Sequence, residues 1–286
     1  MYLIRVLRFI ASIPIITLLE ILKIYNFILL SLDFKNHNSF FEEYLQNILD
    51  NKISKKIFID DKKFIKFYKP SKTSSYRVKT FFYKEPDTIN WMIKNGKKNK
   101  VMFDIGANMG VYSIFYAKKF NSKVFAFEPS IRNLDLLTRN ITLNNLEKNI
   151  TVFSNPLNNE DKISEFFQLD YGGGNAGATF DSNVTKKRMS NQKFQENKTS
   201  SFQTYGISID NLIEKNILPL PNLIKIDVDG NEFNILKGLK KTLRKQRKIS
   251  LLIETRKNTE QKVNVFLKKF KFNLVSRRED NQIWKR

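Results

Sequence analysis

The chain has 286 residues, 41% of them hydrophobic, and a formal net charge of +22. This length allows one α/β domain with a sizeable core and an N-terminal addition. Cysteine is absent, which excludes disulfides, thiolate metal sites and cysteine nucleophiles. The single histidine, His37, precedes the main domain, so a general base within that domain must be a carboxylate, a lysine or a tyrosine, or else be absent.

The positive charge alone would indicate a nucleic acid or an anionic membrane as partner. However, only 12 of the 50 basic residues are arginine, the residue that favours bidentate phosphate contacts. The lysines are also spread along the chain. We therefore expect a diffuse, solvated basic surface and consider a nucleic-acid partner the weaker interpretation.

Residues 1–33 are mostly apolar, but Pro14, Glu20 and Lys23 interrupt the run. No uninterrupted stretch reaches the roughly 20 apolar residues that span a bilayer. Polar residues recur near helical spacing, which favours a helix lying in a membrane interface, with peripheral contact through residues 1–32. A buried or oligomerising helix and a spanning signal anchor are the alternatives.

Residues 34–99 read as a lead-in region with short strands and a helix, including a hairpin over Lys56 to Lys69. Residues 100–286 form the expected main domain. Within it, residues 181–201 have almost no apolar side chains, which predicts a flexible loop or lid.

Short apolar runs alternate with helical patterns along the main domain. The strand candidates, rich in Val, Ile and Phe, are 100–105, 123–128, 149–154, 222–228 and 249–255. The helix candidates are 110–120, 130–145, 231–245 and 259–270. This order predicts a doubly wound α/β sheet. Residues 272–286 add a terminal hairpin with one antiparallel strand.

The stretch "VMFDIGANMGVYS" (Val101 to Ser113) has the pattern of a strand, a tight turn and a helix start. Gly106 and Gly110 allow the backbone to turn and approach a ligand. The dinucleotide fingerprint is incomplete because Asn108 occupies the second glycine position. Asp104 would repel a pyrophosphate but suits a cationic or zwitterionic ligand, such as S-adenosylmethionine.

Glu128 ends the second strand, where a carboxylate can accept both hydroxyl hydrogens of a ribose. NAD and S-adenosylmethionine folds share this feature. Asn155 lies at the tip of the third strand, where it could contact adenine or simply make a turn. The cofactor-binding candidates are Asp104, Gly106, Ala107, Asn108, Gly110, Glu128, Pro129 and Asn155.

At this point the sequence resembles the FkbM-type class I methyltransferases. The resemblance covers Val101 to Trp284 and depends on an ordered series of motifs: "FDIGANMGVYS", "FAFEPS", "NITLNN", "YGGGNAGATF", "ISIDNLI", "LIKIDVDGNEFNILKGL" and "LLIET". It implies a seven-stranded class I (Rossmann-like) fold and S-adenosyl-L-methionine as methyl donor. It also implies transfer usually to an oxygen, often a hydroxyl of a sugar, glycan or secondary metabolite.

The segment "IKIDVDGNE" ends the fourth strand, which in this fold faces the methyl group. Lys225 and Asp227 share a strand face, with Asp229 just beyond. Asp227 or Asp229 would hydrogen-bond the acceptor hydroxyl and take its proton, or bind the amino group of the donor. Glu232 is an equal candidate, or else a charge at a helix N-terminus. Together, Lys225 and these three acids are the catalytic candidates.

A hard metal ion held by Asp227, Asp229 and Glu232 is a weaker alternative, and we expect no metal. The glycine-rich "YGGGNAGATF" either closes over the ligand, with Asn175 and Thr179 as polar contacts, or is a plain connection. The competing functions are an RNA methyltransferase, an NAD-type oxidoreductase and a catalytically silent membrane adaptor. Because the cytosol supplies S-adenosylmethionine, we expect a cytoplasmic enzyme, with attachment to the cytosolic face of a membrane left open.

Overall fold

The computed structural model describes residues 53–168, 173–174, 176–181 and 200–286, with a few positions before residue 49. It divides into two compact units, Met1–Ile53 and Ser54–Arg286, and each is described by itself. The expected N-terminal helix and most of the expected loop at 181–201 lie outside the described residues.

In the first unit, the described residues Glu20, Ile21, Lys23 and Ile24 are helical. Glu20 and Lys23 form an exposed ion pair of 2.7 Å, a kind that contributes little stability. Among the residues that the structure describes, no helix is long and apolar enough to cross a membrane. Membrane contact through residues 1–32 therefore stays a prediction.

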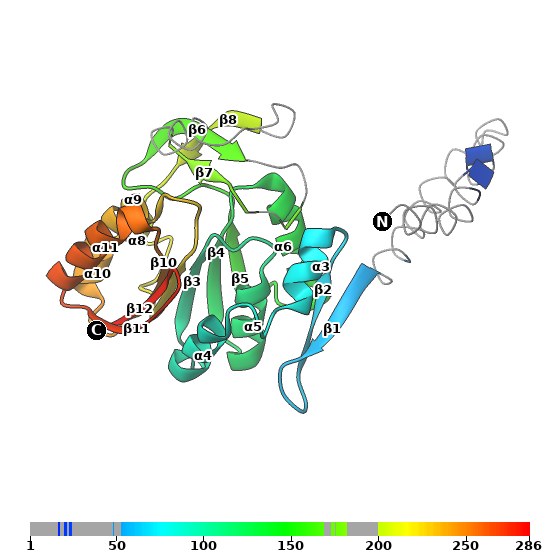
Figure 1. Ribbon diagram of the computed structural model, residues 1–286, viewed down its shortest axis with the longest axis horizontal. Helices are drawn as coiled ribbons and strands as arrows, with labels where there is room; N and C mark the ends of the chain where they lie inside the picture. The colour runs from blue at the N-terminus through cyan, green and yellow to red at the C-terminus, as the bar shows by residue number, and fades with distance from the viewer. Residues whose placement is uncertain are drawn as a thin grey trace. The chain divides into compact units, whose positions relative to one another are not determined.

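The second unit is built on a seven-stranded sheet with the order β11-β12-β10-β9-β3-β4-β5 (Figure 1). Its strands are β3 (Val101–Ile105), β4 (Lys123–Phe127), β5 (Ile150–Phe153), β9 (Leu223–Ile226), β10 (Ser250–Glu254), β11 (Asn273–Arg278) and β12 (Asn281–Lys285). β12 is antiparallel to both β10 and β11, whereas the other neighbours are parallel. The doubly wound sheet and the terminal hairpin predicted from the sequence are confirmed.

Helices cover both faces of this sheet. They are α4 (Pro86–Asn95), α5 (Val111–Phe120) and α6 (Ile131–Leu143) on one face, and α8 (Ile209–Glu214), α9 (Glu232–Lys237), α10 (Lys240–Lys245) and α11 (Lys257–Lys269) on the other. Successive strand residues alternate between the two cores: Met102 packs with α5 and α6, while Phe103 packs with α9 and α11. Continuous apolar runs are needed because both faces are buried.

The helical pattern expected over residues 231–245 forms two helices rather than one. Gly238 separates α9 from α10, and a Cβ there would lie 2.2 Å from the Asn158 carbonyl oxygen. The Asp210 carboxylate then accepts hydrogen bonds from the backbone amides of Lys241 and Thr242, both at 2.8 Å. A close approach and a new N-terminal cap therefore interrupt the helix.

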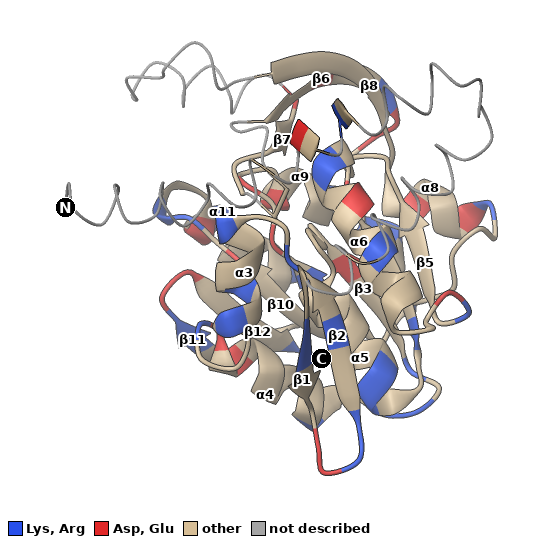
Figure 2. Cartoon of the chain, turned by 90° about the vertical axis from the view of Figure 1, so that its right-hand side faces the viewer, with Lys and Arg blue, Asp and Glu red and all other residues tan. Residues whose placement is uncertain are grey.

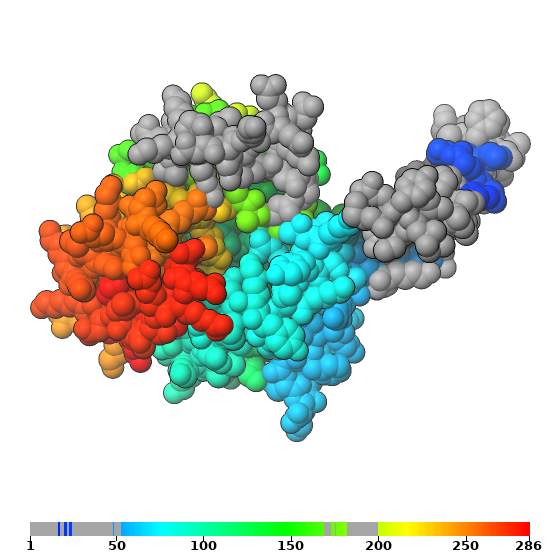
Figure 3. All heavy atoms as spheres, in the orientation of Figure 1, coloured from blue at the N-terminus to red at the C-terminus, as the bar shows by residue number. Residues whose placement is uncertain are grey.

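The described part of the lead-in region packs on the main sheet. The expected hairpin is present as β1 (Ser54–Phe58) and β2 (Phe64–Tyr68), followed by α3 (Lys72–Lys79) and α4. Asn140 of α6 and Asn144, just after that helix, hold β2: their Oδ1 atoms accept hydrogen bonds of 2.7 Å and 2.8 Å from its backbone amides. In the space-filling view, the cyan atoms of this region lie directly against the rest of the second unit (Figure 3).

A second, three-stranded sheet lies above the carboxyl ends of the main strands in Figure 1. It consists of β6 (Lys162–Gln168), β7 (Thr179–Phe180) and β8 (Ser200–Gly206), all antiparallel. The sequence pattern does not predict these strands. Ser200 and Ser201 of the expected loop belong to β8, whereas 182–199 lie outside the described residues.

We predict that Trp91→Ala destabilises the second unit by roughly 3–5 kcal/mol. Trp91 of α4 is 2% exposed and donates a hydrogen bond of 2.8 Å from Nε1 to Ser250 Oγ on β10. The measurement is urea unfolding followed by circular dichroism. Tyr83→Ala is the control, because Tyr83 is 80% exposed and should change stability by no more than roughly 0.5 kcal/mol. Equal unfolding midpoints for both variants would show that α4 does not belong to the cooperative core.

Candidate active site

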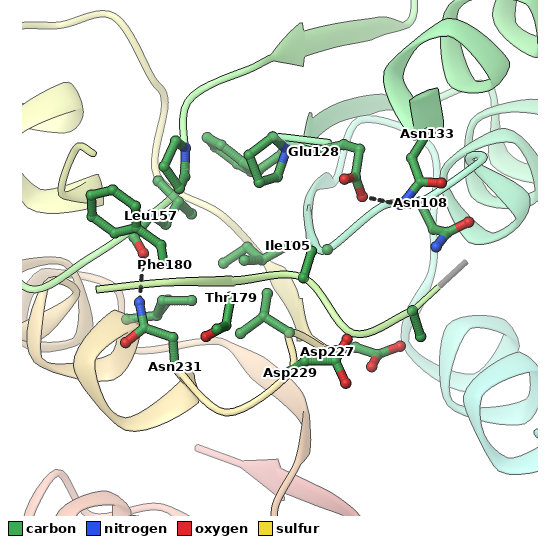
Figure 4. A pocket seen from close by; sticks show the side chains of 18 of the residues that line it. Ile105, Asn108, Glu128, Asn133, Leu157, Thr179, Phe180, Asp227, Asp229 and Asn231 are labelled. Atoms are coloured by element: carbon green, nitrogen blue, oxygen red, sulfur yellow. Dashed lines mark hydrogen bonds between the residues drawn. The ribbon is translucent and has the colours of Figure 1, made fainter. Parts of the chain in front are cut away.

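A pocket opens at the carboxyl ends of β3, β4, β9 and β10, beneath the second sheet (Figure 4). It holds about 990 Å³ of empty space, a volume that includes its open mouth. Ligands of open α/β sheets bind at this edge, where the strand order reverses. In this sheet the reversal lies between β3 and β9.

The turn after β3 forms the floor of the pocket. The backbone amides of Gly106 and Ala107 both donate to the Phe127 carbonyl oxygen at 3.0 Å, which holds the turn against β4. Gly106 has a φ of 80°, and a Cβ there would lie 1.9 Å from the Asp227 carbonyl oxygen. Only glycine allows the end of β9 to approach the turn this closely.

Glu128 points into the pocket from the end of β4. Its Oε2 accepts a hydrogen bond of 2.7 Å from the Asn108 amide, and its Oε1 one of 2.9 Å from the Ser130 amide (Figure 4). The residue is 4% exposed, and burial raises the pKa of its carboxyl to about 7, although these amides act in the opposite direction. Asn133 of α6 also hydrogen-bonds this carboxyl.

Asp104 lies behind the turn and not on the pocket wall. It is fully buried, and its Oδ2 accepts a hydrogen bond of 2.6 Å from Ser113 Oγ. Its other oxygen lies 3.9 Å from Lys225 Nζ. Burial raises the pKa of Asp104, while Lys225 and Ser113 oppose the shift.

Lys225, on β9, carries a buried ammonium group that is only 1% exposed. Its Nζ lies 2.7 Å from Asp227 Oδ2 and 5.0 Å from the centre of the Tyr112 ring. The Tyr112 hydroxyl in turn donates a hydrogen bond of 2.8 Å to Glu85 Oε2 at the start of α4. Although burial favours the neutral form, the nearby carboxylates hold the pKa of Lys225 above its usual value.

Asp227 and Glu254 form a pair of carboxyls on neighbouring strands. The parallel register joins Ile226 to Ile253, so the next residues of β9 and β10 face each other at the pocket. The hydrogen bond to Asp227, followed by burial, raises the pKa of Glu254 to about 9. Burial would also raise the pKa of Asp227, but Lys225 and Glu254 lower it well below its usual value.

Asp229 links the end of β9 to the glycine-rich segment that covers the pocket. Its Oδ1 accepts a hydrogen bond of 2.9 Å from Arg256, and its Oδ2 accepts one from the backbone amide of Gly177 in the glycine-rich segment. In Figure 4, Asp227 and Asp229 lie together, apart from Glu128 and Asn108. Asp229 is thus occupied in holding the roof.

Glu232 begins α9 but does not line the pocket. It is 1% exposed, and its Oε1 accepts a hydrogen bond of 2.9 Å from the Gly230 amide. Its Oε2 has no hydrogen-bond partner among the described residues. Burial raises the pKa of this carboxyl to about 7, with the Gly230 amide opposing the shift.

The glycine-rich segment covers the pocket rather than merely connecting strands. Its described residues Ala176, Ala178, Thr179 and Phe180 line the cavity, and Thr179 Oγ1 is buried without a hydrogen-bond partner among the described residues. Two further bonds tether it at Gly174: the amide donates to Asn133 Oδ1 at 2.8 Å, and the carbonyl accepts from Arg77 Nε at 2.6 Å. Asn175 lies outside the described residues.

The structure brings most of the predicted site residues together. Those that line the pocket are Gly106, Asn108, Glu128, Pro129, Asn155, Asp227 and Asp229. Those placed beside it are Asp104, Ala107, Gly110, Lys225 and Glu232. Asn155 also donates a hydrogen bond of 3.0 Å to the Tyr205 carbonyl oxygen, so it supports β8 as well as the pocket.

Sequence reasoning missed several pocket residues. They are Glu254 on β10, Asn133 on α6, and Arg77, Lys84 and Glu85 of the lead-in region. The "LLIET" motif contains Glu254 and was the one available signal for it. Among the described residues, no group of three or more acidic or histidine side chains gathers as metal ligands would.

The fold and this site define a class I methyltransferase, and comparison with known proteins supplies the family. A sequence profile of the methyltransferase FkbM domain matches residues 104–275, more than half of the chain. The chain therefore belongs to the FkbM methyltransferase family. Members of this family generally use S-adenosylmethionine as methyl donor.

Two curated relatives are similar over part of the chain. The hexuronic acid methyltransferase AglP of Haloferax volcanii is 27% identical over 159 residues, which cover 56% of this chain and 58% of the relative. The methyltransferase sdnD of Sordaria araneosa is 39% identical over 66 residues, covering 22% of this chain and 26% of the relative. The matched parts thus span less than two thirds of either relative.

A solved structure is also similar, that of the methyltransferase FkbM from Methylobacillus flagellatus. It shares 17% sequence identity with a TM-score of 0.45, covering 75% of this chain and 54% of that one.

We predict that Gly106→Ala destabilises the protein by more than the roughly 1–3 kcal/mol that a strained backbone costs. The added methyl group would also meet the Asp227 carbonyl oxygen. The measurement is urea unfolding. Asn121→Gly is the control: Asn121 has a φ of 49° at the end of α5, where glycine is well tolerated. If Gly106→Ala unfolded at the same urea concentration as the wild-type protein, the end of β9 would not be in close contact with the turn.

We predict that Glu232→Gln stabilises the protein at high pH but not at low pH. Because burial raises the pKa of Glu232 in the folded protein to about 7, above its usual value of 4.5, the wild-type protein loses stability as the pH rises through this window. The glutamine variant lacks this loss, so its advantage should grow by roughly 2–3 kcal/mol between about pH 5 and about pH 8. Urea unfolding at both pH values measures it. If the two proteins differed in unfolding free energy by the same amount at both pH values, the pKa of Glu232 would not be raised in the folded protein.

Proposed function

We propose that the protein is an S-adenosylmethionine-dependent O-methyltransferase that acts on a hydroxyl of a sugar or a related small molecule. The observation that carries the donor assignment is the Glu128 carboxyl at the end of β4. Two backbone amides hold it in place, and it faces the cavity beside the Gly106 turn. A carboxylate so placed can accept both hydroxyl hydrogens of a ribose.

The charge of the pocket favours a cationic donor over a dinucleotide. Asp227 and Asp229 line the pocket just beyond the end of β9, where a pyrophosphate would meet their carboxylate charges. The sulfonium and amino groups of S-adenosylmethionine fit this environment. Asn108, in place of the second glycine of the dinucleotide fingerprint, agrees with this preference.

The acceptor is inferred more coarsely. The name of one relative specifies hexuronic acid, which supports a sugar acceptor here. The pocket divides into a side formed by β3 and β4, with Glu128, and a side formed by β9 and β10, with Asp227 and Glu254. We place the nucleoside on the first side and the acceptor hydroxyl on the second.

S-adenosylmethionine supplies an already activated methyl group for an in-line displacement, so positioning supplies most of the acceleration. In this proposal Glu128 orients the ribose, the Gly106 turn gives the nucleoside close access to the backbone, and the roof around Thr179 excludes water. Asp227 orients the acceptor hydroxyl. Asp104 and Lys225 do not line the pocket, and their role is to fix the charge and position of Asp227.

The parts of the chain have separate roles in this proposal. Residues 100–286 carry the catalysis, and the lead-in region, residues 34–99, adds Arg77, Lys84 and Glu85 to the pocket wall. Residues 1–33 form an amphipathic helix that contacts the cytosolic face of a membrane. Figure 2 supports the diffuse basic surface, because Lys and Arg are spread over the described elements and interspersed with Asp and Glu. Nucleic acid is therefore the less favoured substrate.

Isothermal titration of the full chain with S-adenosylmethionine, S-adenosylhomocysteine and NADH tests the donor assignment. We expect micromolar binding of both sulfur compounds and no binding of NADH. Glu128→Gln should weaken both by at least about tenfold, because the ribose loses a charged partner. Glu160→Gln, an exposed change of the same kind, is the control and should bind normally. Binding of NADH alone, or of no ligand, would overturn the proposal.

A further inference from the structure

Asp227 and Glu254 share a single proton in the free protein, for a geometric reason. Their strands run in parallel register with Ile226 beside Ile253, so the residues that follow lie side by side, and both side chains line the same pocket. Two neighbouring carboxylates in one pocket repel each other when both are ionised. One member of the pair must therefore be protonated.

The surrounding charges decide which carboxyl holds the proton. The Lys225 ammonium lies 2.7 Å from Asp227 and keeps that carboxyl ionised. The pKa of Glu254 is raised to about 9, so Glu254 carries the proton at neutral pH. Asp229 adds to this shift, Lys225 opposes it, and the positive charge of Arg77 acts on Asp227.

The donor would bring a positive charge to this pair. The Gly106 turn and the Asp227 backbone are in direct contact, because even one added methyl group at Gly106 would overlap the Asp227 carbonyl oxygen. A ligand with its ribose at Glu128 and its reactive end toward β9 therefore places its sulfonium beside the pair. A nearby positive charge favours the ionised form of a carboxyl.

We propose that binding of S-adenosylmethionine expels the proton shared by Asp227 and Glu254, and that the Glu254 carboxylate so formed is the catalytic base for the acceptor hydroxyl. This inference depends on the proposed function and deepens it. It names Glu254 as the group that touches the acceptor and assigns cofactor binding as the step that activates it.

The resulting step balances in atoms and charge. The acceptor oxygen forms a bond to the methyl carbon, and the carbon–sulfur bond breaks with its electron pair going to sulfur. The hydroxyl proton passes to the Glu254 carboxylate. The pair then again holds one proton and a charge of minus one. The products are the methyl ether and the neutral thioether, S-adenosylhomocysteine.

A consequence is that the proton reaches solvent when the donor binds and not when the methyl group is transferred. S-adenosylhomocysteine lacks the sulfonium charge, so it should bind without expelling the shared proton. Glu128 also titrates near neutral pH, because burial raises its pKa to about 7. Both ligands carry the same ribose, so the contribution of Glu128 cancels when the two are compared. Glu232 does not line the pocket.

The test is isothermal titration of the full chain at about pH 8, in two buffers with different ionisation enthalpies. The dependence of the binding heat on the buffer gives the number of protons released. We expect S-adenosylmethionine to release about one proton more than S-adenosylhomocysteine. Equal release by the two ligands would overturn the inference.

Glu254→Gln isolates the residue responsible. Glutamine can still donate a hydrogen bond to Asp227 but has no proton to lose. The variant should bind both ligands and show no difference in proton release, whereas Glu160→Gln should keep the difference. If Glu254→Gln kept the wild-type difference in proton release between the two ligands, the proton would come from another group and the proposal would be refuted.

The two proposals fail separately. If the wild-type protein binds neither sulfur compound, the donor assignment is wrong. If it binds both with equal proton release, the donor assignment stands and the role of Glu254 is wrong.

Discussion

The buried ammonium group of Lys225 is the constraint on which the site depends. A charge with 1% exposure on a central strand is tolerated only when it is paired, because its desolvation is otherwise too costly. Asp227 and Asp104 provide the pairing, at 2.7 Å and 3.9 Å. Since Asp104 is on β3 and Lys225 on β9, the ion pairs join the two strands that flank the reversal of strand order. The Tyr112 ring and Glu85 extend the same network to α4.

This network separates two carboxyls that would otherwise be alike. Glu128 and Glu254 both lie at strand ends and both have a raised pKa, but the causes differ. Burial dominates at Glu128, whose backbone donors favour a fixed acceptor of hydrogen bonds. At Glu254 the neighbouring Asp227 dominates, because Lys225 keeps Asp227 ionised. The first environment suits recognition of a ribose, and the second suits movement of a proton.

Sequence patterns predicted the main sheet because its strands are buried on both faces and read as continuous apolar runs. They also predicted Gly106 and Glu128, which lie in local motifs. Sequence patterns could not predict the pairing of Glu254 with Asp227, because it depends on the register between β9 and β10. The second sheet was missed because its two long strands, β6 and β8, are mostly half-buried or exposed and lack continuous apolar runs, while β7 has only two residues. The break between α9 and α10 likewise depends on a distant contact at Asn158.

Arg77, Lys84 and Glu85 line the pocket, yet they precede residues 104–275, which the family profile matches. The Gly106 turn with Glu128 and this part of the pocket wall are therefore encoded in different stretches of the gene. Mutation or recombination upstream can change Arg77, Lys84 and Glu85 while the Gly106 turn and Glu128 are unchanged. An ancestral enzyme could acquire new acceptors in this way without rebuilding its means of holding the methyl donor.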